Sequence, residues 1–164
     1  MISGKDLIMN RVILTIILPI TSLILSVPGF SQDAFAEHKI KGLKGLRNLS
    51  VVIEPSTQKD IDSLKEWVDM VELGLHRKAP EITLSEVKKS SAWLVLSIAT
   101  TEEGCFLELS IFRWVKVLDT GEEIFSKTWW DSRIIFGDVT RKSMQDALDI
   151  LLTSFAADYL RAKR

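Results

Sequence analysis

Few side chains in this sequence have the types and spacing that catalysis requires. Two adjacent pairs of glutamates, Glu102-Glu103 and Glu122-Glu123, are the best candidates for acid–base chemistry. Paired carboxyls do such work when a pocket shifts their pKa values apart. Both pairs fall in predicted turns, where solvent surrounds the two carboxylates equally. We therefore expect them to be surface residues.

Metal-binding and nucleophilic motifs are also missing. The chain has two histidines, His38 and His76, and a single cysteine, Cys105. Zinc sites need clustered histidines and cysteines, and the sequence has no nucleophile elbow, phosphate-binding glycine loop or dinucleotide fingerprint. A lone cysteine is more often a buried apolar side chain than a reactive thiol. We expect no catalytic residue, no metal site and no cofactor, and hence no enzyme.

The remaining candidates lie on two long predicted strands, 105–118 and 123–136. Alternation with a period of two gives the first strand one apolar row for the core and a second row that contains Phe112 and Trp114. Neither row of the second strand is cleanly apolar, so one of its two tryptophans joins this second face. Aromatics with a polar rim are typical of a partner surface. The predicted binding residues are Phe112, Trp114, Lys127, Trp129, Asp131 and Arg133.

Two alternatives remain open for this surface. The segment before the first strand covers the aromatic rings, or the rings lie against the aliphatic stems of lysines and arginines. Asp131 and Arg133 are two apart on one strand face and are expected to form a surface pair of little energetic weight.

The elements that must position these residues follow from their hydrophobic periodicity. Strands are expected at 46–54, 82–84, 92–100, 105–118 and 123–136, with charged, glycine-bearing turns between the last three. Apolar residues three and four apart predict amphipathic helices at 59–77 and 140–162. Both helices have one apolar stripe, so both must cover a sheet. The predicted fold is α+β: a mostly antiparallel sheet of four to five strands with two long helices on one face.

The N-terminus has the parts of a secretory signal. Lys5 and Arg11 precede an uncharged apolar run at 12–27, and Ala34-Phe35-Ala36 has the small-x-small pattern of a signal peptidase site. We predict a signal peptide at 1–36 cleaved after Ala36, a basic lead-in at 37–45 and one domain at 46–164, which is periplasmic or secreted. The alternative is an uncleaved N-terminal anchor, with translation from Met1 or Met9.

Charge excludes one class of partner and leaves another open. The formal net charge is −1, which gives no support for nucleic-acid binding, because such domains show a basic surplus. Lys39, Lys41 and Lys44 form a local basic segment after the predicted cleavage point. Membrane contact is expected only through these lysines or through a retained signal.

One stretch resembles a known group. Val71–Ile82 (VELGLHRKAPEI), the strand 93–99 and the Thr128-Trp129-Trp130 run resemble uncharacterised bacterial exported domains, in which an acidic-Leu-x-Leu-basic helix end leads into a short strand. The arrangement is also similar to the N-terminal lobe of TolB-like periplasmic proteins. This resemblance implies a bacterial envelope domain and implies no catalytic residue.

The leading hypothesis is therefore an exported, non-enzymatic domain that binds a protein or envelope component, or a second copy of itself, through the open sheet face. The alternative is a small-molecule-binding or hydrolytic domain whose site is assembled from scattered polar residues.

N-terminal sequencing of the exported chain tests the predicted signal. Cleavage after Ala36 gives Glu37 as the first residue, because the small-x-small pattern ends there. Recovery of Met1 or Met9 as the first residue contradicts cleavage and supports an anchored chain.

Overall fold

The computed structural model describes residues 32–56 and 64–164. It divides into two compact units, Met1–Glu37 and His38–Arg164. Nearly all of the predicted signal peptide lies outside the described residues, and helix α2 (Gln32–Lys41) extends across the predicted cleavage point after Ala36. Among the described helices, none has the length and apolar composition needed to cross a membrane.

The second unit has the predicted order of elements, with boundaries that differ by a few residues. Its elements are β1 (Asn48–Pro55), α4 (Leu64–Lys78), β2 (Thr83–Leu84), the short 3-10 helix η1 (Val87–Lys89), β3 (Ala92–Thr100), β4 (Gly104–Lys116), β5 (Glu123–Phe136) and α5 (Arg141–Ala162). The first turn predicted for α4, from Lys59, lies outside the described residues.

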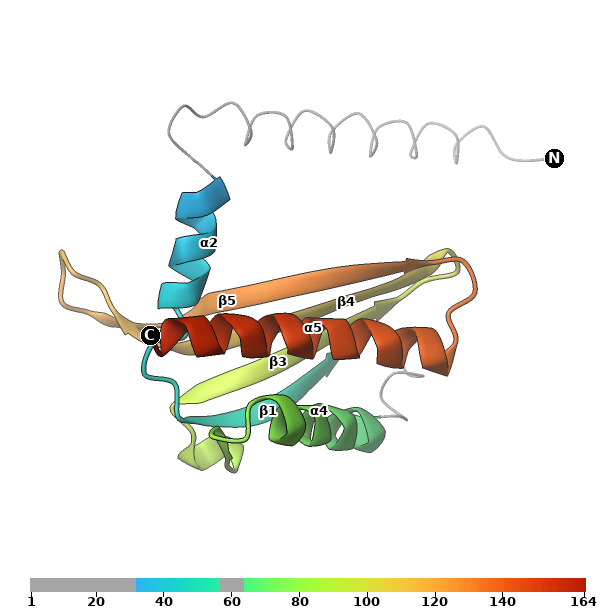
Figure 1. Cartoon of the computed structure of the whole chain (residues 1–164), viewed down its shortest axis with the longest axis horizontal. Coiled ribbons are helices and arrows are strands. Elements are labelled where there is room, and N and C mark those ends of the chain that lie inside the picture. The colour runs from blue at the N-terminus through green and yellow to red at the C-terminus, as the bar shows by residue number, and fades with distance from the viewer. Residues whose placement is uncertain (1–31, 57–63) are drawn as a thin grey trace. The chain divides into compact units, whose positions relative to one another are not determined.

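The five strands form one mixed sheet in the order β2-β1-β3-β4-β5. β1 runs parallel to both β2 and β3, whereas β3, β4 and β5 are antiparallel. The parallel pairs follow from α4, because a helical crossover returns the chain to the same end of the sheet. The α+β class is confirmed, and α4 and α5 both lie on one face of the sheet (Figure 1). The sheet is mixed, whereas a mostly antiparallel sheet was expected.

The core fills the space between the two helices and that face. The apolar stripes of both helices face this core only in part: α4 buries Trp67, Val71 and Leu75, whereas Leu160 near the end of α5 is exposed. α5 begins with a capping box between Thr140 and Ser143, which satisfies the first free backbone groups of the helix. Its buried residues are Ala147, Leu148, Leu151, Leu152, Phe155, Ala156 and Tyr159.

The segment predicted as a basic lead-in contributes to this core. Leu43 is 1% exposed and lies among the sheet and helix residues of the core. Arg113, which interrupts the apolar row of β4, donates hydrogen bonds from Nη1 to the backbone oxygens of Gly42 (3.5 Å) and Lys44 (2.9 Å). Arg113 therefore ties the lead-in to the sheet on the helix-covered side.

Gly42 packs so closely against β5 that a side chain does not fit. A Cβ placed on Gly42 would lie 2.1 Å from the backbone oxygen of Thr128. We expect Gly42→Ala to lower the free energy of unfolding by about 1–3 kcal/mol, because backbone must move to relieve the clash. Urea denaturation measures the loss.

Gly74→Ala is the matched control for this substitution. Its Cβ meets the flexible end of Leu152, and alanine suits a helix better than glycine does, so the loss should be smaller. Equal stability of Gly42→Ala and the wild type would contradict the packing of the lead-in.

Candidate functional site

A β-bulge in β5 decides which side chains reach each face of the sheet. The pairing of β4 with β5 shifts between Ile111, which lies opposite Trp129, and Phe112, which lies opposite Lys127. Thr128 is the extra residue, and one extra residue reverses the facing of everything beyond it. Residues 125 and 127 therefore share a face with Phe112, whereas residue 129 points to the other face.

This reversal places Trp129 in the core. Its side chain is 0% exposed and packs edge-on against Phe155 of α5, with ring centroids 5.3 Å apart. Its indole N–H donates to Asp158 Oδ2 at 3.0 Å, and Lys39 Nζ lies 5.0 Å from the ring centroid. The prediction that Trp129 belongs to the open face is wrong, because unbroken alternation along β5 was assumed.

Asp131 and Arg133 follow Trp129 onto the helix-covered side. They lie opposite Leu109 and Leu107, which are fully buried beneath the helices. Their assignment to the open face is wrong for the same reason. The expected ion pair between the two is not formed either, since Asp131 Oδ1 accepts from the backbone N–H of Ser132 at 2.9 Å.

Four aromatic rings gather on the open face, and we call Trp93, Phe112, Trp114 and Phe125 the aromatic cluster. Phe125 is its centre: its ring centroid lies 4.8 Å from that of Trp93, 6.0 Å from that of Phe112 and 5.4 Å from that of Trp114. The rings come from β3, β4 and β5, so the pleated sheet holds them in place. Trp114 is 58% exposed, and the other three rings are half-buried.

A charged pair borders the aromatic cluster. Lys127 forms an ion pair with Glu108 of the neighbouring strand, and its Nζ also lies 5.6 Å from the centroid of the Phe112 ring. Both contacts fix the lysine beside the rings. Phe112, Trp114 and Lys127, three of the six predicted binding residues, are thus close together.

Two members of the cluster were absent from the predicted site, Trp93 and Phe125. Trp93 alternates with the buried Leu94 in β3 and lies opposite Phe112, so the period of two places it on the open face. Phe125 shares a row with Trp129 in a regular strand. Only the bulge places Phe125 on the open face and Trp129 on the helix-covered face.

Neither α4 nor α5 packs on the aromatic cluster. α4 and α5 contact the opposite face of the sheet, and Arg113 holds the described lead-in on that same side. The expectation that the lead-in covers the rings therefore does not hold for residues 42–44, which Arg113 holds on the other side of the sheet. Trp130, beyond the bulge, lies opposite Ser110 on the open face and has contacts of its own.

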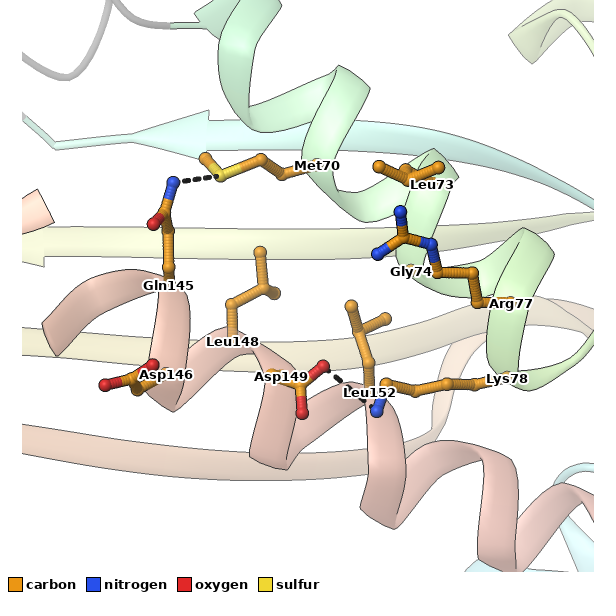
Figure 2. Close-up of a pocket in the computed structure, with 10 residues that line it drawn as sticks. All are labelled: Met70, Leu73, Gly74, Arg77, Lys78, Gln145, Asp146, Leu148, Asp149 and Leu152. Carbon is orange, nitrogen blue, oxygen red and sulfur yellow. Dashed lines mark hydrogen bonds and ion pairs between the residues drawn. The ribbon is translucent and has the colours of Figure 1, made fainter. Parts of the chain in front are cut away.

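A groove of about 430 Å³ lies between α4 and α5 (Figure 2). Some of its polar groups bind one another: Lys78 pairs with Asp149 at 2.9 Å, and the Gln145 amide lies 3.5 Å from the Met70 sulfur. Leu148 and Leu152 of α5, with Leu73 and Met70 of α4, contribute the apolar part of its lining. No charged side chain of the groove is left buried without a partner in the described structure.

Chemistry elsewhere in the described residues is limited. No three His, Cys, Asp or Glu side chains in this part of the chain gather where they could hold a metal ion. Cys105 is 2% exposed, which confirms it as a buried residue. Glu102, Glu103, Glu122 and Glu123 are exposed, as expected for turn residues.

Comparisons with known proteins add structural likenesses of low similarity. The chain is similar to a PelC dodecamer from Paraburkholderia phytofirmans (10% identity, TM-score 0.40, covering 73% of this chain and 89% of that one). It is also similar to a minor lipoprotein from Acinetobacter baumannii (15% identity, TM-score 0.27, covering 72% of this chain and 90% of that one). A third likeness is to a lipoprotein from Neisseria meningitidis (7% identity, TM-score 0.32, covering 68% of this chain and 98% of that one).

No family model matches the chain, and no curated protein matches its sequence. Because every one of the three TM-scores lies below 0.5, these likenesses carry no conclusion about function. The resemblance to the TolB-like lobe stays a prediction.

The stability losses of two alanine variants distinguish a tryptophan on the helix-covered face from one on the open face. Trp129→Ala should lower the free energy of unfolding by about 3–5 kcal/mol, because it removes a fully buried ring. Trp114→Ala should cost less than about 1 kcal/mol, because its ring is mostly exposed. Urea denaturation of both variants measures the difference, and similar losses for the two would contradict their placement on opposite faces.

Proposed function

We propose that this chain is an exported, non-enzymatic domain that binds a protein partner through the aromatic cluster. The observation that carries the proposal is Trp114, which is 58% exposed at the rim of a four-ring cluster on the face opposite α4 and α5. Large aromatic residues are enriched where proteins bind one another. A tryptophan that enters a partner's pocket often dominates the binding energy.

The strands beneath the cluster support binding without rearrangement. Phe125 contacts three other rings, and Lys127 is held by both Glu108 and the Phe112 ring. Side chains fixed before binding lose little conformational entropy on association. The charged pair beside the rings supplies the polar rim of such a surface.

The predicted signal and the resemblance to bacterial exported domains favour a partner in the periplasm or the envelope. In this proposal, contact between the basic lead-in and an anionic membrane surface is secondary to binding of the protein partner. Lys44 is exposed, whereas Lys39 lies over the Trp129 ring. Lys44 is therefore better placed than Lys39 to meet a lipid headgroup.

Small-molecule binding in the groove between α4 and α5 is the alternative function. Its size suits a ligand, and the observation in its favour is the apolar lining from Leu148 and Leu152. Of the charged residues that line the groove, only Arg77 has no ion pair within the described structure, which leaves little polar chemistry to orient a substrate. The aromatic cluster is therefore the stronger candidate.

Capture of partners from an envelope extract tests the proposal. Trp114→Ala should reduce recovery of the specific partner by roughly 30-fold, which corresponds to the loss of a hot spot worth about 2 kcal/mol. Leu118→Ala is the control, because Leu118 is 96% exposed and lies outside the cluster. Equal recovery of the same proteins by wild type and Trp114→Ala would overturn the proposal.

A further inference from the structure

β5 leaves a long backbone edge without a strand beside it in the described structure. The sheet order ends with β5, which has 14 residues, whereas the opposite edge strand, β2, has two. A long unpaired edge presents N–H and C=O groups that readily pair with another strand. Charged residues on such an edge decide which strand it accepts.

The pairing pattern identifies the backbone groups that point outward. Gly137 N–H donates to the oxygen of Glu103, so odd-numbered residues of β5 bond to β4. Because alternate residues of an antiparallel strand serve opposite neighbours, the backbone groups of residues 130, 132 and 134 point away from the sheet. In one copy of the chain, the Asp131 carboxylate occupies the outward N–H of Ser132.

We propose that a second copy of this chain pairs with β5 in antiparallel register about a two-fold axis at Ser132. This register sets Ser132 opposite Ser132, and it sets Asp131 of each copy opposite Arg133 of the other. Opposite charges on directly facing residues favour pairing. β5 is thus complementary to itself.

Asp131 and Arg133 are both available to form ion pairs between the two copies, which supports this register. Arg133 is exposed and has no ion-pair partner among the described residues. Asp131 is half-buried and binds only the Ser132 N–H. In the paired state each Ser132 N–H donates to the backbone oxygen of the other Ser132, which frees each Asp131 for an arginine.

The bulge limits how far the two strands can pair. Gly42 of the lead-in approaches the backbone oxygen of Thr128, so the edge is occupied at that point. The edge on which the inference depends is the part beyond the bulge that is centred on Ser132, from Asp131 to Arg133. On the open face beside this stretch, Ile134, which is 60% exposed, comes opposite Trp130 of the other copy.

The helix layer also accommodates a second copy. α4 packs along one flank of α5, and by helical spacing Ala147, Ile150 and Ser154 lie on the other flank. Ile150 is 49% exposed there. Antiparallel pairing of two β5 strands brings the two α5 helices side by side along this flank, so the joined sheet keeps one covered face.

Sedimentation of the purified exported chain over a concentration series tests the register. The wild type should form a dimer. Asp131→Arg and Arg133→Asp each place like charges opposite one another, and each should raise the dimer dissociation constant at least tenfold. The double variant Asp131→Arg/Arg133→Asp restores opposite charges and should restore the dimer, which a merely misfolded chain would not do.

Disulfide cross-linking through a cysteine at the two-fold axis tests the same contact directly. Directly opposite residues in a hydrogen-bonded pair lie about 5.5 Å apart at Cα, which is within disulfide range. Ser132→Cys should therefore give a covalent dimer on oxidation. Ser126→Cys, on β5 before the bulge, should not, and the native Cys105 is too buried to compete.

Three results would overturn the inference. One is a wild-type chain that stays monomeric at every concentration. Another is a dimer that tolerates both single charge reversals and is not captured by Ser132→Cys. A dimer that Trp114→Ala abolishes and Asp131→Arg leaves intact would place the contact on the aromatic cluster instead of the edge.

Discussion

The extra residue in β5 is the constraint on which both faces of the sheet depend. Thr128 reverses the strand, so that Phe125 and Lys127 face one way and Trp129 faces the other. A regular strand would bring Trp129 out beside Phe125, and the space beneath α5 would lose its largest buried side chain. The close approach of Gly42 to the Thr128 oxygen, with Arg113 holding the same segment, supports the strand at this point.

Three surfaces of different character follow from this geometry. The helix-covered face is closed by apolar packing, with Trp129 anchored to Asp158. The open face carries the aromatic cluster next to an ion pair. Beyond the bulge, the outer edge of β5 has backbone groups that point away from the sheet and two charges, Asp131 and Arg133. A partner protein and a second copy would therefore use separate surfaces and need not compete.

Most of the architecture was predictable from sequence, because its signals are local. The apolar stripe of α5, the alternation in β3 and the turns around β4 each belong to a few neighbouring residues. The site was predictable only in part. The bulge has no local signature in β5, because Thr128 is an ordinary strand residue, and the backbone that packs against it comes from Gly42, more than 80 residues earlier. Trp129, Asp131 and Arg133 were misplaced together for that single reason.

Exchange of the tryptophan indole N–H groups with solvent, followed by NMR, tests the placement of the two faces most directly. The chain has five tryptophans, and single tryptophan-to-phenylalanine variants assign their signals. The account predicts that the Trp129 N–H, which is buried and bonded to Asp158, exchanges slowly, whereas that of the exposed Trp114 exchanges rapidly. Similar, rapid exchange of both would show that β5 runs without the bulge, and the aromatic cluster would then be assembled differently.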